Sequence, residues 1–243
     1  MVQSKQMADW HSQSPGKNLL AAERLALQSL LADKFGYHAL QLGRIKGNNW
    51  LESSRMLHKI FLSPVADDSS ANNRICADFA ALPFAPDSID LAVVPHVLEF
   101  AAEPLQILQE IYTVLIPEGY IVVLGYNPLS LWGGTKLIKS RRCYPWHGQF
   151  VTSYRVRRWL RDIGYWVVDH KSLFFRPPLA SSAWQEKLLF LEGVGQMLWP
   201  YFGAAFLIVA QKRTTKPIPI CAREKPKRVS VRHGVVQPTR LNR

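Results

Sequence analysis

Cysteine is scarce in this chain and widely spaced. Only Cys76, Cys143 and Cys221 occur, and no Cys-x-x-Cys pair is present. An odd number of cysteines at such spacing excludes a disulfide framework and the common zinc-binding patterns. Free cysteines of this kind are typical of a reducing compartment. We therefore expect a cytoplasmic protein with no metal site.

Apolar runs of the kind that direct a chain to a membrane are also lacking. The N-terminal stretch MVQSKQMADWHSQSPGK is polar and has no signal-peptide core. The segment 188–210 is long and apolar enough to span a bilayer, with Glu192 as its one formally charged residue. Three glycines and Pro200 interrupt it, which favours a buried helix followed by a strand. Contact with an anionic membrane surface, aided by a basic tail, stays open as an alternative.

Acidic residues are nearly absent from the C-terminal tail. From Gln211 onward there are ten Lys/Arg and one acid, so this segment carries nine of the twelve net positive charges. We expect an arm over 1–17, a folded domain over 18–212 and a basic, disordered tail over 213–243. The tail and the arginines around Trp159 raise nucleic acid as an alternative partner. No recognised RNA-binding motif accompanies them.

The rest of the chain has enough apolar residues for one core, since 48% of the 243 residues are hydrophobic. Helical periodicity and capping residues predict helices over 18–36, 104–115, 152–164 and 182–199. Short apolar runs predict strands over 38–43, 58–63, 74–77, 91–94, 120–125, 165–169 and 203–210. This alternation indicates an α/β fold, with a mainly parallel seven-stranded sheet and helices on both faces. Ligands bind such sheets at the carboxyl ends of the strands.

One segment, 77–125, carries an ordered motif: ADFAALPFAPDSIDLAVVPHVLEFAAEPLQILQEIYTVLIPEGYIVVLG. Asp78 follows the third expected strand, Leu-Pro-Phe comes next, and Asp90 opens the fourth strand. A helix, a Leu-x-Pro-x-Gly turn and a fifth strand complete the pattern. It resembles the class I S-adenosylmethionine-dependent methyltransferases, in particular the group called methyltransferase type 11. Two longer stretches, VVPHVLEF and LIPEGYIVVLGYNPLSLWG, resemble the sequences of a bacterial subgroup of this family without a defined substrate.

The resemblance implies a Rossmann-like class I fold and S-adenosylmethionine as cofactor. By that resemblance, Asp78 would accept a hydrogen bond from the adenine amino group, and the main chain of Phe79 together with Leu82 would close over the adenine ring. The main chain near Gly43 and Pro95 would also hold the cofactor. The implied activity is methyl transfer to a small or amphiphilic acceptor.

The glycine-rich loop departs from the family pattern of an acid followed by Gly-x-Gly-x-Gly. Gly43 and Gly47 match the outer glycines, but Gln41 replaces the acid and Ile45 the middle glycine. A branched side chain resists positive φ and fills space that the cofactor needs. This degenerate loop supports the alternative function, a non-catalytic binding or scaffold protein with the same fold.

Two residues are candidates for the acceptor side. His96 follows the fourth strand and is predicted to act as a general base. Its alternative is a histidine that hydrogen-bonds neighbouring main chain. Asn127, after the fifth strand, is predicted to touch substrate, and its alternative is a turn before a helix capped by Ser130. The aromatic segment 132–147 is predicted to form a lid or to cover the core.

Overall fold

The structure is a computed structural model that describes residues 10, 14, 16–43, 49–65, 73–138, 145–178, 187–188, 190–199 and 201–214. The described strands are β1 (His38–Leu42), β2 (His58–Ser63), β3 (Arg74–Cys76), β4 (Ile89–Pro95), β5 (Leu115–Tyr126), β6 (Tyr165–Leu173) and β7 (Ala205–Lys212). The described helices are α2 (Gly16–Leu31), α3 (Pro104–Val114), α4 (Leu131–Ile138), α5 (Ser153–Ile163) and α7 (Phe190–Leu198).

The seven described strands form one sheet in the order β3-β2-β1-β4-β5-β7-β6. Neighbouring strands from β3 to β5 are parallel, and β7 lies antiparallel between β5 and β6. The chain moves outward from β1 to β3 and then returns to β4 on the other side of β1. The strand order thus reverses between β1 and β4, and doubly wound sheets bind ligands in the crevice outside the carboxyl ends of the strands at such a point. The predicted mainly parallel sheet is confirmed.

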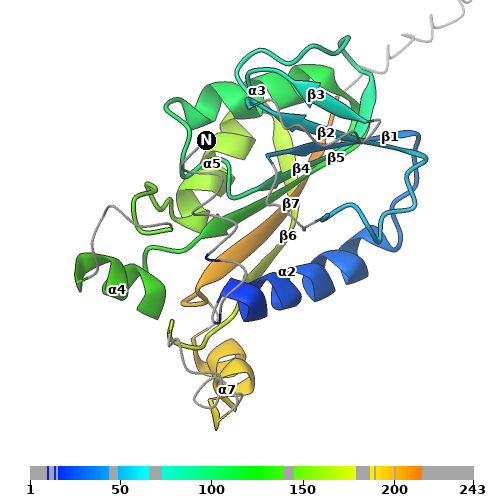
Figure 1. The fold of residues 1–243 in the computed structure, drawn as a ribbon. Coiled ribbons are helices and arrows are strands. Elements are labelled where there is room, and N and C mark those ends of the chain that lie inside the picture. Colours follow the sequence, from blue (N-terminus) through cyan, green and yellow to red (C-terminus); the bar gives the residue numbers. More distant parts are fainter. Residues whose placement is uncertain are drawn as a thin grey trace, which may run out of the picture.

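Helices cover both faces of the sheet, as the alternating pattern predicts (Figure 1). Leu20, Leu27 and Leu31 of α2 pack with Leu91 and Val93 in one apolar cluster. A second cluster holds the other face of β4 together with α3 and α5. Because β4 is covered on both sides, its apolar residues follow one another without alternation.

Local signals in the sequence explain several element ends. Asp90 Oδ2 accepts hydrogen bonds from His38 N at 2.9 Å and Tyr37 N at 3.2 Å, and so ties the start of β4 to the start of β1. Thr152 caps α5 by accepting from Arg155 N. Gly164 ends α5 in the left-handed region at φ 117°. The caps predicted for α5 are confirmed.

Some predicted boundaries were wrong. α2 begins at Gly16, before Asn18, and β5 begins at Leu115, inside the expected turn. β6 extends to Leu173 because it pairs along its length with β7. Pairing across the sheet, which local propensity does not report, sets the two strand ends.

The N-terminal arm contributes to packing through Trp10, whose ring lies 5.5 Å from that of Trp132 in an edge-on contact. Ser182 and Gln185, the predicted capping box before α7, lie outside the described residues, as does the tail after residue 214. Among the helices that the structure describes, none has the length and apolarity needed to cross a membrane.

Candidate functional site

Three residues from different strand ends meet at the crevice between β1 and β4. Gly43, directly after β1, has φ +74°, and a Cβ there would lie 3.0 Å from Val97 Cγ2 and 3.9 Å from Phe79 Cζ. Val97 follows β4, and Phe79 follows β3. The sequence predicted Gly43 and Phe79 but missed Val97, whose position two residues after Pro95 was the available signal. Pro95 itself is the last residue of β4 and is buried.

Asp78 is exposed beside this crevice and shapes the loop that contains Phe79. Its Oδ1 accepts a hydrogen bond from Ala80 N at 3.1 Å. Helix α3 holds the same loop, since Gln106 Nε2 donates to Ala80 O at 3.3 Å and Leu82 N donates to Glu110 Oε2 at 3.4 Å. A carboxylate has about four acceptor positions, so Asp78 keeps capacity for a ligand.

Gln41 links the two ends of the altered glycine loop. Its side chain is fully buried, its Nε2 donates to Gly43 O at 3.1 Å, and its Oε1 accepts from Trp50 N at 3.2 Å. An acid could accept from Trp50 but could not donate to Gly43. The amide thus replaces charge with a loop-closing pair of hydrogen bonds. Ile45 and Gly47 lie outside the described residues.

His96 is at the end of β4 but does not face an open site. Its side chain is 0% exposed, and its φ is +52°. Its Nε2 lies 2.8 Å from Glu23 Oε1 of α2, and its Nδ1 lies 3.6 Å from Glu99 Oε1. The ring stacks on Tyr126 with centroids 4.0 Å apart. The contacts favour a structural histidine, though its partners are carboxylates and an aromatic ring rather than main chain.

The two carboxylates control the protonation of His96. Burial lowers the pKa of His96, but the negative charges of Glu23 and Glu99 and the hydrogen bond with Glu23 outweigh burial and raise the pKa to about 10. The imidazole is therefore protonated at neutral pH. A general base must be deprotonated to accept a proton, so this arrangement does not support that role for His96.

The cluster of His96 and its two acids has unused acceptors. Glu99 Oε1 accepts from Tyr126 N at 2.6 Å. Among the described residues, Glu23 Oε2 and Glu99 Oε2 are buried and have no hydrogen-bond partner. The two acids therefore keep unused acceptor positions beside His96 at the carboxyl end of β4.

Asn127 is buried, and its amide is engaged within the protein. Its Nδ2 donates to Tyr201 O at 2.7 Å and Gly203 O at 3.1 Å, while its Oδ1 accepts from Leu129 N at 3.1 Å. Ser130 Oγ accepts from Gly133 N at 3.2 Å and caps α4. These bonds match the alternative predicted for this segment, a turn before a capped helix. The predicted contact of Asn127 with substrate stays a prediction.

The aromatic segment predicted as a lid covers the core beyond β5. Trp132 is fully buried, and its Nε1 donates to Arg176 O at 2.9 Å. Its ring packs edge-on against Phe174 at 5.7 Å and lies 6.1 Å from that of Trp146. Lys136 of α4 donates to Gly148 O. The described part of this segment therefore packs as core.

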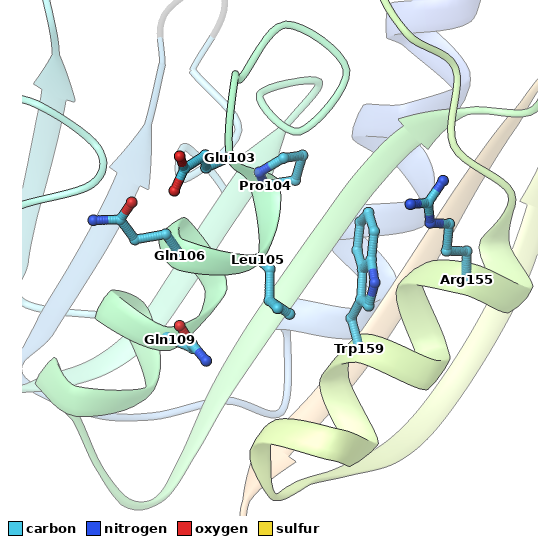
Figure 2. A pocket seen from close by; sticks show the side chains of 7 residues that line it. All are labelled: Glu103, Pro104, Leu105, Gln106, Gln109, Arg155 and Trp159. Carbon is cyan, nitrogen blue, oxygen red and sulfur yellow. The ribbon is translucent and has the colours of Figure 1, made fainter.

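A separate groove lies between α3 and α5 (Figure 2). Its volume is about 530 Å³. It is lined by Glu103, Pro104, Leu105, Gln106, Gln109, Arg155 and Trp159. The Arg155 guanidinium lies over the Trp159 ring, 4.8 Å from its centroid. None of the predicted cofactor residues lines this groove, so it is distinct from the crevice between β1 and β4.

Sequence comparison links the chain to methyltransferases. The family described as "Methyltransferase domain" matches residues 56–123. This range includes β4, which borders the crevice, and α3. The uncharacterised protein YafS of Escherichia coli K12 is 29% identical over 209 residues, covering 84% of this chain and 80% of YafS.

Solved structures share the fold at low identity. An S-adenosylmethionine-dependent methyltransferase of Archaeoglobus fulgidus has a TM-score of 0.54 and 18% identity, covering 78% of this chain and 94% of that one. One from Thermotoga maritima has a TM-score of 0.56 and 17% identity, covering 80% and 89%. The [4+2]-cyclase SpnF has a TM-score of 0.53 and 15% identity, covering 79% and 81%. Over residues 56–123 the chain is therefore similar to the methyltransferase domain family, and the domain has the fold of class I S-adenosylmethionine-dependent methyltransferases.

Proposed function

We propose that this protein transfers a methyl group from S-adenosylmethionine to a small or amphiphilic acceptor. The observation that carries the proposal is the convergence of Gly43, Phe79 and Val97 at the crevice between β1 and β4. Exposed Asp78 lies beside them. The cytoplasmic location belongs to the same proposal and rests on the scattered cysteines.

The residues at the crevice fit the adenosyl part of the cofactor. Gly43 leaves open the space that a Cβ would fill, and its φ of +74° is one that other residues rarely adopt. Phe79 and Val97 offer an apolar surface for a planar base, and Asp78 has an acceptor for an amino group. Pro95 ends β4 beside this surface. These features support Gly43, Asp78, Phe79 and Pro95 as cofactor-binding residues.

The acidic residues beside His96 also favour binding of S-adenosylmethionine. S-adenosylmethionine brings a positively charged sulfonium and thereby an electrophilic methyl group. Glu23 and Glu99 stand beside His96 at the end of β4, and a carboxylate in a partly dry site favours a cationic cofactor. Since the methyl group is already activated, orientation of the two reactants supplies much of the rate. We assign His96 a positioning role in place of proton abstraction.

The alternative is a non-catalytic protein with the same fold. Gln41 favours it, because both ends of its amide are used to close the loop. The cyclase SpnF shows that this fold hosts other activities. The RNA-associated alternative rests on the basic tail and on the arginines around Trp159 in α5.

Transfer of a labelled methyl group tests the proposal. The protein is incubated with S-adenosylmethionine carrying a labelled methyl and with either a lipid extract or an aqueous metabolite extract. We expect label in a product from one of the two, and partition between solvents then assigns the acceptor to the amphiphilic or the small polar class. Cofactor binding without label in any product would exclude methyl transfer to both classes.

Asp78→Asn gives a sharper version of this test. The variant should lower the rate of labelling at low cofactor concentration, because the amide is a weaker acceptor than the carboxylate. Asp162→Asn is the matched control: its side chain is 64% exposed at the end of α5 and pairs only loosely with Arg158 at 3.8 Å. The control should label as the wild type does.

A further inference from the structure

The groove between α3 and α5 has one aromatic and one aliphatic wall. Trp159 of α5 and Leu105 of α3 lie on opposite sides of it (Figure 2). The amides of Gln106 and Gln109 line the α3 side. Leu105 is 40% exposed, so the aliphatic wall is open to solvent. A small ligand buries most of its surface in its site, whereas an extended peptide buries one side only. The open groove therefore favours a peptide.

The described chain leaves the sheet beside one end of this groove. β7 ends at Lys212, whose Nζ lies 4.8 Å from the centroid of the Tyr112 ring in the last turn of α3. The same Nζ donates to Leu115 O, directly after α3, at 2.6 Å. Gly164, which ends α5, also borders Tyr112, since a Cβ there would lie 3.1 Å from the Tyr112 hydroxyl. The chain after Lys212 therefore starts where both helices end, one helical turn beyond Gln109.

The sequence that follows supplies an apolar segment of suitable chemistry. Residues 217–220 read Pro-Ile-Pro-Ile and carry no charge. Proline and the residue before it favour extended backbone. Proline-rich segments bind aromatic grooves in the polyproline II form, whose carbonyls make no internal hydrogen bonds. The amides of glutamine and the indole of tryptophan can donate to such carbonyls.

The length of chain after β7 is sufficient for this segment to lie in the groove. Ile220 stands eight residues after Lys212, a reach of at most about 26–29 Å in extended chain. Tyr112 and Pro104 are eight residues apart in α3, or about 12 Å along the helix axis. The segment can therefore run from the Tyr112 end of the groove to the Pro104 end.

Charge and tethering favour this occupant over others. Glu103, an exposed acid, lines the groove beside Pro104. Arg223 is the first charged residue after the segment and would follow at that end, where the opposite charges attract. A tethered segment has an effective concentration of about millimolar, an advantage that a separate peptide or a second copy lacks. We propose that residues 217–220 of this chain dock in the groove between α3 and α5.

Paramagnetic relaxation in the full chain tests this docking. A nitroxide is attached to Cys221, one residue after the segment, in a chain carrying Cys76→Ser and Cys143→Ser. We expect strong broadening of the Trp159 indole N–H signal and little broadening for Trp50, which is buried on the other face of the sheet with α2. A Trp159 signal as sharp as that of Trp50 overturns the proposal. No S-adenosylmethionine is needed, so the result is independent of the proposed methyl transfer.

A double variant separates docking from the mere proximity of a tethered tail. Ile218→Ser/Ile220→Ser should lower the docking equilibrium constant about tenfold or more, because two apolar side chains are lost from the groove. The Trp159 signal should then sharpen. Val229→Ser/Val231→Ser is the matched control from the same tail and should leave the broadening unchanged. Equal broadening of Trp159 in the two variants overturns the proposal.

A variant of the groove gives the reciprocal test. Leu105→Ser should sharpen the Trp159 signal, whereas Leu25→Ser on α2, where Leu25 is 69% exposed, should not. If Leu105→Ser does not fold, the two tail variants decide, because they change no residue of the folded domain.

A mixed sample identifies a different occupant. Nitroxide-labelled chain is combined with isotope-labelled chain that carries no nitroxide, so that broadening reports contact between two copies. We expect no broadening of Trp159 in this mixture. Broadening as strong as that within one chain would overturn docking of the chain's own segment and assign the groove to the tail of a second copy.

Discussion

His96 Nε2 and Glu23 Oε1 lie 2.8 Å apart, although 73 positions separate these residues and both side chains are fully buried. The contact joins α2, on one face of the sheet, to the carboxyl end of β4. Because β4 borders the cofactor crevice, the ion pair fixes a wall of the proposed site.

Removing Glu23 should be strongly destabilising. Glu23→Ala leaves His96 with one acid at a longer distance, and breaking a buried ion pair costs about 3–5 kcal/mol. The free energy of unfolding in urea measures this loss. Glu52→Ala is the control, because Glu52 is 73% exposed and lies 3.8 Å from Arg24. An exposed pair of this kind contributes about 0–1 kcal/mol, so equal losses in the two variants would contradict the account.

The protonation of His96 predicts a loss of stability at high pH. The pKa of His96 is about 10 in the folded protein, against 6.5 ordinarily. The stabilisation is complete below the ordinary value and disappears as pH rises through the folded value. Unfolding measured across this range should show the decline, and His96→Asn should reduce it. An NMR titration of the ring with a midpoint near 6.5 would contradict the assignment.

Gly43→Ala should weaken cofactor binding and lower stability. At φ +74° a non-glycine residue costs about 1–2 kcal/mol, and the added methyl would lie 3.0 Å from Val97 Cγ2. Gly134→Ala is a useful comparison, since nothing lies within 4 Å of its Cβ position in α4. That change should stabilise the helix by up to about 1 kcal/mol. Calorimetry and thermal unfolding measure the two effects, and tolerance of alanine at Gly43 would contradict the geometry.

Asn127→Ala should destabilise the protein more than Ser130→Ala. The first change leaves the buried carbonyl of Gly203 without its amide donor, at roughly 1–3 kcal/mol, and also removes the part-buried bond to Tyr201 O. The second removes one helix cap, worth about 0.5–2 kcal/mol. Urea unfolding of both variants gives the comparison. If Asn127→Ala lowers methyl transfer and leaves stability unchanged, the predicted substrate contact is supported and the structural role is contradicted.

Much of the sheet could be predicted because its signals are local. The continuous apolar run of β4 and the caps of α5 need no distant partner to be recognised. Strand ends such as Leu173 of β6 could not be placed, since pairing with β7 determines them.

The environment of His96 could not be predicted from its neighbours in sequence. Its partner Glu23 lies on another element, and no local pattern joins them. A signal was nevertheless present: Glu23 stands four residues after Leu19 and four before Leu27, on the buried stripe of α2. An acid on an apolar helix face needs a partner in the core. The partner of Glu23 is His96, at the end of β4.

Calorimetric titration with S-adenosylmethionine and S-adenosylhomocysteine tests the central claim most directly. We predict that both ligands bind the wild type, that Asp78→Asn weakens binding, and that Ile45→Gly strengthens it by freeing space in the loop. Ile45→Gly with unchanged affinity would show that the loop does not obstruct the cofactor. No heat from either ligand at millimolar concentration would contradict the cofactor site and favour the non-catalytic alternative.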